Sequence, residues 1–497
     1  MTGVSSNPDG ACPAPDLQAI LEMQRRSFIS DGPPSAAVRQ SRIDRLLTLV
    51  LDNCDEFAEA LVEDFGTRSK TASTFMEAYG IVAQIQHSRA RLKDWMRPVK
   101  PMRAGRIFGV RAEIRPTPIG VVGIIGPWNI PVNLVALPAA DAFAAGNRVM
   151  IKASEITPRT ADILQRKAPE YFDQTELAVV TGGVDVSARF AALPLDHIFF
   201  TGSPQVGALV AQAAAPNLVP VTLELGGKNP VVISRAADIG VAAKRIAKGR
   251  LVNGGQTCIC PEYVFVPAES MDDFAEALRH AFRAIAPTIE GNDDYCSSVN
   301  AANYERVVAL IDDARHLGAS IDVVAPSTEH LPNSVLRKIA PTIVRGVTDE
   351  MRIASEETFG PAICLLSYTH VDDVIRYVNA RPAPLVAYWY GPDSTDFREF
   401  IRRTRSGSVA RNDYGAQMIA LSAPFGGVGR SGMGAYHGKA GFDNFSHYRT
   451  VVGTDLPFSI TGIVAPPYPA AKRVAVRIAV ASARRRAHRR IARNRTE

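Results

Sequence analysis

A pair of cysteines one residue apart is the first feature of this sequence that could carry chemistry. Residues 253–260 read NGGQTCIC, so Cys258 and Cys260 follow a Gly-Gly-Gln-Thr run. The pair is consistent with a metal site, a disulfide, two buried thiols, or one nucleophile with a bystander. Only about 3% of a thiol with a pKa near 8.5 is thiolate at pH 7, so a nucleophile here needs activation or high intrinsic reactivity.

The spacing of the two cysteines disfavours two of these interpretations. Zinc needs four ligands, and no second Cys or His pair with suitable spacing lies nearby. On an extended strand, residues i and i+2 lie about 6.6 Å apart, which is too far for a relaxed disulfide. We therefore expect no metal. We expect Cys260 to be a buried small hydrophobe, and the alternative is a reversible protective link with Cys258 under oxidation.

A carboxylate and an amide occupy positions from which they could assist a nucleophile. Glu224 lies in LELGGKNP, at the end of a predicted strand, where apolar surroundings would raise its pKa and suit a general base. The alternative is an ion pair with Lys228. Asn129, in GPWNIP, could stabilise a developing alkoxide by about 3 kcal/mol. The alternative for this residue is a turn.

Two other segments could bind a dinucleotide. In HIFFTGSPQVG, Gly202 and Gly207 bracket a turn that opens a helix, and a helix N-terminus suits a pyrophosphate. In VMIKASE, Lys152 and Glu155 follow a strand, where they could hold ribose hydroxyls or form a surface salt bridge. A Glu that faces the 2′-hydroxyl repels a 2′-phosphate, so this pair favours NAD over NADP. The one GxGxxG match, residues 427–432, lacks the strand and helix that the fingerprint requires.

Alternating strands and helices must position these residues. Helical periodicity covers residues 17–96, and later segments alternate between apolar strand-like runs and helices. The expected elements are strands 112–114 and 120–125, helix 134–145, strand 148–151, helix 158–168, strands 177–180 and 197–201, helix 204–215, strands 219–224 and 230–233, helix 237–248, strand 264–266 and helix 271–284, with alternation continuing to about residue 388. This order predicts an α/β protein with a parallel sheet covered on both faces. The glycine-rich residues 424–438 mix aromatics with glycines, which is typical of an ordered loop.

Length and composition fit a multidomain globular protein. A chain of 497 residues exceeds one hydrophobic core, so we expect two or three domains. Six scattered cysteines suit a reducing compartment, and the N-terminus shows no signal-peptide h-region, so we expect a cytoplasmic protein. Residues 116–140 carry no charge but contain five prolines and two asparagines, which makes them a poor membrane span.

The net charge of +6 belongs to the C-terminal tail. Residues 471–497 hold ten Lys or Arg and one Glu, so the other 470 residues sum to −3. The tail is either a solvated, partly disordered end or a segment that contacts an anionic membrane surface or nucleic acid. The expected partners do not include nucleic acid, and weak peripheral membrane contact remains the alternative.

Seven motifs occur in order over roughly 300 residues: GPWN, KASE, FTGSPQVG, LELGGK, GQTC, EETFGP and PFGGVGRSGMG. Together they resemble the aldehyde dehydrogenase superfamily. HSRARLKDWMRP, GMGAYHGKAGFDNFSHYR and PPYP are similar to the class 3 and coniferyl aldehyde dehydrogenase branch, whose members oxidise aromatic and medium-chain aliphatic aldehydes. The resemblance covers residues 20–469.

The resemblance implies a role for each matching residue. It implies that Cys258 is the nucleophile, Glu224 the general base and Asn129 the oxyanion donor. It implies cofactor contacts, with NAD as the expected cofactor and NADP as the alternative, from Trp128, Lys152, Glu155, Gly202, Ser203, Gly207, Glu357 and Phe359.

The implied reaction is aldehyde oxidation to a carboxylic acid through a thiohemiacetal and a thioester on Cys258, with hydride leaving to the nicotinamide. The alternatives are a dehydrogenase that releases acyl-CoA, a cofactor-independent cysteine hydrolase, and a non-catalytic binding protein. The presence of Glu224 favours water over CoA as the acyl acceptor. Many relatives have Tyr where this chain has Ile130 and His where it has Gln417, so these positions bear on the aldehyde tunnel.

The resemblance also implies a domain organisation. The NAD-binding domain comprises residues 1–105 and 119–225, and the catalytic domain comprises residues 226–432. A β-arm for oligomerisation comprises residues 106–118 and 446–453, and residues 470–497 form the basic tail. An arm that pairs across protomers implies a homodimer or a dimer of dimers.

Overall fold

The computed structural model describes residues 16–102, 109–457 and 459–494. It divides into two compact units. One unit holds the residues up to Arg97 together with Pro116–Tyr448, and the other comprises Pro98–Arg115 and the residues from Arg449 onward. The tail residues 495–497 and the predicted arm residues 106–108 lie outside the described part of the chain.

The first of two sheets in the large unit has six strands, in the order β14-β6-β5-β2-β3-β4. Its strands are β2 (Val121–Ile125), β3 (Arg148–Lys152), β4 (Leu177–Val180), β5 (His197–Gly202), β6 (Val221–Leu225) and β14 (Gly432–Met433). All neighbours are parallel except β14, which runs antiparallel to β6. The carboxyl ends of the five parallel strands therefore share one edge.

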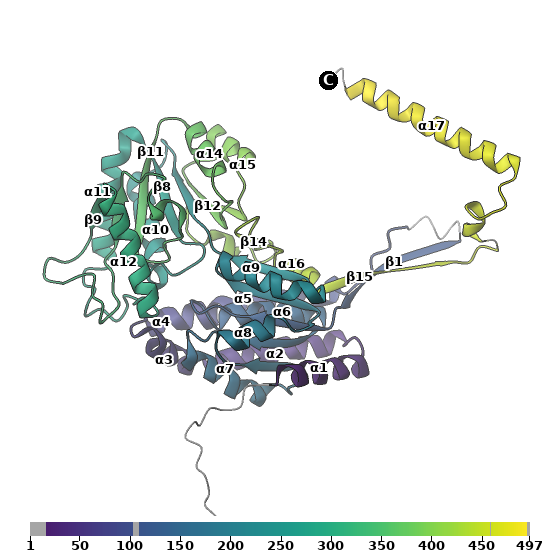
Figure 1. Ribbon diagram of the computed structural model, residues 1–497, viewed down its shortest axis with the longest axis horizontal. Coiled ribbons are helices and arrows are strands. Elements are labelled where there is room, and N and C mark those ends of the chain that lie inside the picture. The colour runs from purple at the N-terminus through teal and green to yellow at the C-terminus, as the bar shows by residue number, and fades with distance from the viewer. Residues whose placement is uncertain (1–15, 103–108, 458, 495–497) are drawn as a thin grey trace, which may run out of the picture. The chain divides into compact units, whose positions relative to one another are not determined.

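Helices cover both faces of this sheet (Figure 1). The helices of this region are α1 (Leu17–Asp31), α2 (Ala36–Asp52), α3 (Cys54–Phe65), α4 (Lys70–Ser73), α5 (Gly80–Trp95), α6 (Asn133–Ala145), α7 (Pro158–Tyr171), α8 (Val184–Ala191), α9 (Pro204–Ala214) and α16 (Gly438–Asn444), with a π-helix, η1, at Thr74–Tyr79. Val122 and Ile124 pack with α2, α5 and α6 in one core, whereas Val121 packs with α1, α8 and α9 in another. Burial on both faces explains why these strands read as continuous apolar runs.

The second sheet of the large unit has seven strands, in the order β13-β12-β7-β8-β11-β10-β9. Its strands are β7 (Asn229–Ile233), β8 (Pro261–Pro267), β9 (Ser320–Val323), β10 (Thr342–Arg345), β11 (Ala362–Tyr368), β12 (Val386–Tyr390) and β13 (Ser408–Arg411). Only β9 is antiparallel to its neighbour.

The helices that cover the second sheet are α10 (Ile239–Leu251), α11 (Met271–Ile285), α12 (Ala301–His316), α13 (Arg352–Ser355), α14 (Val371–Asn379) and α15 (Thr395–Arg403). Val231 and Val264 pack with α10 and α11, and Val232 and Phe265 pack with α14 and α15 on the opposite face (Figure 1). The α/β architecture with helix-covered parallel sheets, predicted from the alternation, is confirmed.

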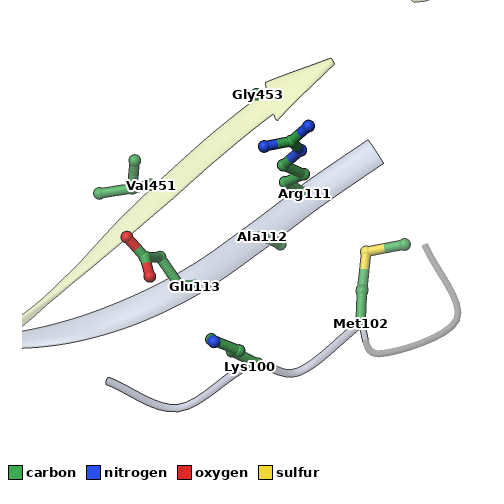
Figure 2. Close-up of a pocket in the computed structure, with 7 residues that line it drawn as sticks. All are labelled: Lys100, Met102, Arg111, Ala112, Glu113, Val451 and Gly453. Atoms are coloured by element: carbon green, nitrogen blue, oxygen red, sulfur yellow. The ribbon is translucent and has the colours of Figure 1, made fainter. Parts of the chain in front are cut away.

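The small unit contains a two-stranded sheet and a long helix. Strand β1 (Val110–Pro118), whose last three residues belong to the large unit, pairs with β15 (Ser446–Thr454), as predicted for the arm. A pocket on this sheet places Lys100, Arg111 and Glu113 beside Met102 and Val451 (Figure 2). The role of the sheet in oligomerisation and the predicted domain limits stay predictions.

The described part of the C-terminal tail is helical. Helix α17 (Ala470–Asn494) is continuous, although the sequence left a partly disordered end open. Its charged residues are all basic, and valines and isoleucines such as Val476 and Ile478 are exposed. No helix in the described part of the chain combines the length and apolar character that crossing a bilayer requires.

The element predictions were wrong at three places. Helix α8 lies between β4 and β5, where two successive strands were expected. Strand β6 starts at Val221 rather than Val219, because Leu218 adopts a left-handed conformation that ends the preceding turn. Residues 257–260 form a turn, closed by the Cys260 N–H donating to the Thr257 carbonyl (3.0 Å), and not the extended strand assumed in the disulfide argument.

Candidate active site

The loop that carries Cys258 follows a stretch of left-handed backbone. It connects the 3₁₀-helix η4 (Val252–Gly255) to β8, and within η4 Asn253, Gly254 and Gly255 have φ of 52°, 63° and 80°. A Cβ on Gly255 would lie 2.2 Å from the Gly360 carbonyl oxygen, so only glycine fits there. The Asn229 side chain closes the loop from below, donating to the carbonyls of Cys258 (2.8 Å) and Cys260 (2.9 Å).

Cys258 and Cys260 have different surroundings. Cys258 is partly exposed, whereas Cys260 is buried, as predicted, with its thiol directed at the Gly249 carbonyl (3.5 Å). Both are free thiols. Among the described residues no cluster of three or more His, Cys, Asp or Glu could hold a metal ion. The turn geometry therefore gives the two thiols separate environments.

Asn129 reaches the cysteine loop directly. Its side chain is buried, and its amide donates to the Gln256 carbonyl (3.0 Å), two residues before Cys258. Its backbone carbonyl accepts from Arg68 (2.8 Å) and from the Asn253 side chain (3.0 Å). An amide has two N–H donors, so one fixes the side chain and the other is available to a substrate oxygen.

Glu224 is an unpartnered buried carboxyl at the end of β6. Neither of its oxygens has a hydrogen-bond partner among the described residues, and burial raises its pKa well above the ordinary value. The alternative ion pair with Lys228 does not form. Lys228 binds the buried Glu262 instead (2.7 Å), and Arg250 binds the other oxygen of Glu262 (2.7 Å). Burial thus favours the protonated form of Glu224, whereas only its carboxylate form can act as a base.

Cys258, Glu224 and Glu357 form one electrostatically coupled group. Burial, followed by the charges of Glu357 and Glu224, raises the pKa of the Cys258 thiol to about 12. Burial also raises the pKa of Glu357 to about 8. The resting nucleophile is therefore a thiol, and it must lose its proton when substrate binds.

Glu357 and Phe359 meet residues from the first sheet. The Glu357 carboxyl covers Gly226, where an added Cβ would lie 2.1 Å from its oxygen. Phe359 has a φ of 48° and packs edge-on against Trp128, with ring centroids 5.4 Å apart. The segment that carries these two residues thus lies against the loops that follow β2 and β6.

Lys152 and Glu155 form the expected pair, 3.1 Å apart, at the end of β3. The ammonium of Lys152 is buried and also donates to the Ala153 carbonyl (2.7 Å), so the pair is not a simple surface salt bridge. Both readings of the pair, ion pair and ribose site, remain compatible with this geometry.

Gly202 and Ser203 form the turn between β5 and α9, and Gly207 lies in the first turn of α9. Ser203 caps α9, accepting from the Val206 N–H (3.3 Å). A Cβ on Gly202 would lie 2.4 Å from the Phe200 ring, and one on Gly207 would lie 2.8 Å from Leu225. The glycines thus allow α9 to begin close to the sheet, with its free N–H groups at the same edge as Lys152. This donor set fits a dinucleotide pyrophosphate and ribose.

The structure brings the predicted residues to one edge of the six-stranded sheet. Asn129 follows β2, and Glu224 lies in β6. Lys152 ends β3, and Gly202 ends β5. The cysteine loop comes from the second sheet and is joined to this edge by the Asn129–Gln256 bond. The sequence analysis missed the supporting residues Arg68 and Gln256, which bear no chemical signature in the sequence.

Tyr436 is a further residue that the sequence analysis did not single out. It lies in the glycine-rich segment, which is ordered as predicted because Phe425 and Tyr436 pair through two backbone hydrogen bonds and β14 pairs with β6. The aromatic residues of that segment were the feature of the sequence that could have pointed to Tyr436. Gln417 is also unusual, because neither of its amide atoms, both inaccessible to solvent, has a hydrogen-bond partner within the described chain.

The sequence profile of the aldehyde dehydrogenase family matches residues 14–451. Three relatives are a probable coniferyl aldehyde dehydrogenase of Caulobacter vibrioides (42% identity, covering 88% of this chain and 90% of the relative), a coniferyl aldehyde dehydrogenase of a Pseudomonas species (41%, 90% and 92%), and a dimeric NADP-preferring aldehyde dehydrogenase of mouse (33%, 89% and 95%).

Solved structures agree with the sequence relatives. The substrate-bound Staphylococcus aureus AldH has a TM-score of 0.85 at 33% identity, covering 93% of this chain and 99% of that one. Pseudomonas syringae aldehyde dehydrogenase C, in complex with NAD⁺ and octanal, has a TM-score of 0.79 at 28% identity, covering 90% of each. The chain belongs to the aldehyde dehydrogenase family. It is therefore an oxidoreductase that acts on aldehydes and yields the acid.

Proposed function

We propose that this chain oxidises an aromatic or medium-chain aldehyde to the carboxylic acid through a covalent adduct on Cys258. The observation that carries the proposal is the hydrogen bond from Asn129 to the cysteine loop, because it joins an oxyanion donor to the nucleophile of the other sheet. Glu224, unpartnered and electrostatically coupled to the same thiol, is the base.

The residues of this chain have separate roles in the steps of the reaction. The Cys258 thiol gives its proton to water as its sulfur bonds to the aldehyde carbon, and the free N–H of Asn129 donates to the resulting oxyanion. A nicotinamide cofactor, when bound, would supply the acceptor for the hydride that leaves this carbon. The carboxylate form of Glu224 then takes a proton from water, the water oxygen bonds to the acyl carbon, the carbon–sulfur bond breaks, and the sulfur recovers a proton from Glu224. The products are the acid and the free cysteine.

Replacement of the nucleophile tests the covalent route. Cys258→Ala should lower NADH formation by at least about 10³-fold, because no other group can carry the adduct. Cys260→Ala is the matched control, since its thiol faces the Gly249 carbonyl, and it should retain activity. NADH production by the Cys258→Ala protein at the wild-type rate would disprove the mechanism.

The acyl acceptor is water rather than CoA. Glu224 supports this assignment, since a base is needed to activate water. Analysis of the product in the presence of CoA should give the free acid alone. Recovery of an acyl-CoA thioester would favour the CoA-acylating alternative instead.

The substrate is an aromatic aldehyde of the coniferyl type. Two relatives at 41–42% identity carry that name, whereas a structural neighbour was solved with octanal. Rates with coniferyl aldehyde, benzaldehyde and octanal, followed by NADH absorbance, should give the highest kcat/KM with coniferyl aldehyde. A higher value with octanal would move the assignment to medium-chain aldehydes.

The cofactor is NAD, with Trp128, Lys152, Glu155, Gly202, Ser203, Gly207, Glu357 and Phe359 as its contacts. The Glu155 carboxyl, one-third exposed beside Lys152, would repel a 2′-phosphate. Glu155→Gln should therefore lower the KM for NADP while changing kcat little. An unchanged ratio of kcat/KM for the two cofactors would show that Glu155 does not face the ribose.

The arm formed by β1 and β15 joins protomers into a dimer or a dimer of dimers. A two-stranded sheet alone is only marginally stable in water. Val451 and Val452 are exposed on β15, and the charged pocket of Figure 2 lies on the same sheet. Packing against a second copy would cover these side chains.

Helix α17 contacts an anionic membrane surface, and we assign the protein to the cytoplasm, peripheral to the membrane. The helix carries nine Lys or Arg and no Asp or Glu, and its exposed apolar residues include Val474 and Val480. The full chain should co-sediment with phosphatidylglycerol vesicles at low salt, whereas a chain that ends at Pro469 should stay in the supernatant. Equal sedimentation of both chains would end this assignment.

A further inference from the structure

Tyr436 is held in one orientation against the six-stranded sheet that carries the candidate base. Its backbone N–H donates to the Phe425 carbonyl (2.8 Å) and its carbonyl accepts from the Phe425 N–H (3.0 Å). Its buried ring packs edge-on against Phe199, with centroids 5.0 Å apart, and against His437, at 4.2 Å. These contacts fix both ends of the residue, so its hydroxyl has a defined direction.

The register of the sheet places Glu224 on the face that Tyr436 covers. Phe199 pairs with Thr222 in the parallel β5–β6 ladder, and paired residues of a parallel sheet point to the same side. Glu224 lies two residues after Thr222 and therefore shares that side. Gly432 pairs with Glu224 in the antiparallel β14–β6 ladder, and Tyr436 follows four residues later. The strand pairings thus place Glu224 on the face of the sheet that Tyr436 covers.

Glu224 lacks the donor that an ionised base requires. Its two oxygens have no hydrogen-bond partner among the described residues, and burial disfavours the carboxylate. A buried carboxylate is stable only when hydrogen bonds or a cation support its charge. Lys228, the nearest lysine in sequence, is already bound to Glu262. The Tyr436 hydroxyl is a neutral group that can supply the missing bond.

We propose that Tyr436 is a positioning residue for Glu224, whose hydroxyl donates a hydrogen bond to the carboxylate when the base is ionised. The inference rests on the proposed function. Tyr436 keeps its proton throughout: water gives its proton to Glu224, its oxygen bonds to the acyl carbon, and the Cys258 sulfur leaves. The hydrogen bond favours the charged form of Glu224 and aims it at the thioester.

The other titratable groups around Tyr436 leave its hydroxyl protonated. Burial is the largest cause that raises its pKa well above the ordinary value, and the nearby acidic groups of Glu224, Cys258 and Asp141 act in the same direction. His437 packs against the ring, and burial lowers its pKa to about 4, so it is neutral. Glu357 acts on the same cluster through Cys258. The phenol therefore remains a donor over the working pH range.

Tyr436→Phe removes the hydroxyl and keeps the ring, which makes it the test. The burst of NADH that reports acylation should retain its amplitude. The steady-state rate at pH 7 should fall about tenfold or more, and the acid limb of kcat should move to higher pH by about one unit or more, because the pKa of Glu224 rises. A merely structural role would not move the pH limb. If Tyr436→Phe kept the NADH burst and the acid limb of its kcat profile matched that of the wild type, the inference would be overturned.

Two further variants keep the test decisive. In a Glu224→Gln background, Tyr436→Phe should cause no additional loss, since it acts only through the carboxylate, and additive losses would contradict the inference. Tyr368→Phe is the matched control: its buried hydroxyl donates to the Ile233 carbonyl (2.7 Å) in the second sheet, and its pH limb should match wild type. Failure of the proposed function would appear differently, as a burst that survives Cys258→Ala.

Discussion

At the scale of single residues, the buried carboxyl groups of Glu262 and Glu224 differ in their hydrogen-bond partners. Glu262 accepts hydrogen bonds from Lys228, Arg250 and Thr358, and although burial raises its pKa, the two cations outweigh that effect and lower the pKa to about 2. Glu224 has no such partner among the described residues, and burial raises its pKa well above the ordinary value. The carboxylate of Glu262 is thus compensated by two cations, whereas the candidate base is not.

Glu262→Gln should destabilise the protein by about 3–5 kcal/mol, because it leaves the cations of Lys228 and Arg250 buried without a counter-charge. Urea unfolding at pH 7 measures the change. Glu269→Gln breaks an exposed ion pair with Arg235 and should change stability far less. Similar losses in both variants would contradict the distinction between buried and exposed pairs.

Asp141 predicts a pH dependence of stability. Burial raises the pKa of this carboxyl to about 8, while the backbone N–H of His437 (3.1 Å) only partly opposes the shift. The folded protein keeps a proton that the unfolded chain loses near pH 4, so this stabilisation is present below about pH 4 and is lost as the pH rises toward 8.

Asp141→Asn should therefore remove this pH dependence. Relative to the variant, the wild type should lose about 1.4 kcal/mol of unfolding free energy per pH unit between pH 5 and pH 7. Unfolding curves at several pH values measure the difference, with the exposed Asp294→Asn as control. Parallel stability profiles for wild type and Asp141→Asn would refute the shift.

At the scale of elements, the site depends on short loops at the ends of strands. The 3₁₀-helix η4 is left-handed at three residues and passes against the Gly360 carbonyl, immediately before the loop that carries Cys258. The loop after β2 is anchored by Arg68 and by Glu77, whose carboxylate accepts from the Val132 and Asn133 N–H groups (3.0 Å each). Rigid loops of this kind hold donors at fixed distances.

Gly255→Ala should lower kcat/KM by about tenfold or more, because the added Cβ would strike the Gly360 carbonyl and L-residues resist positive φ by about 1–2 kcal/mol. Gly291→Ala is the matched control, since nothing lies within 4 Å of its added Cβ, and its activity should be that of wild type. Steady-state kinetics with a single aldehyde distinguish the two. Equal activity in both variants would show that the turn tolerates a side chain.

At the scale of the whole molecule, the chain separates into a large unit that holds every candidate site residue and a small unit that holds most of the arm and α17. Charge follows the same division: the excess of basic residues lies in α17. Catalysis and association should therefore be separable by changes confined to the small unit.

Val452→Glu tests the arm. Placing a charge on this exposed position of β15 should shift the protein toward monomers, because the carboxylate would lose its hydration in an interface. Sedimentation velocity measures the change, and Glu399→Gln, on the surface of α15, serves as control. A sedimentation coefficient equal to that of wild type would place the interface elsewhere.

The sequence by itself determined the family, the alternation of the two sheets and the identity of the candidate nucleophile, base and amide. These follow from ordered motifs and from apolar periodicity, which are local properties of the chain. It did not locate α8, and it mistook the turn at residues 257–260 for a strand, because neither feature leaves a strong local pattern.

Only the tertiary structure decided which side chains form ion pairs and hydrogen bonds with one another. Lys228 lies four residues from Glu224 but binds Glu262, which follows 34 residues later in the sequence, and Asn129 reaches the cysteine loop across 127 residues. Tyr436 reaches the region of Glu224 only because β14 returns to the first sheet. Burial and strand pairing set these contacts, and both depend on the packing of distant segments rather than on neighbouring residues.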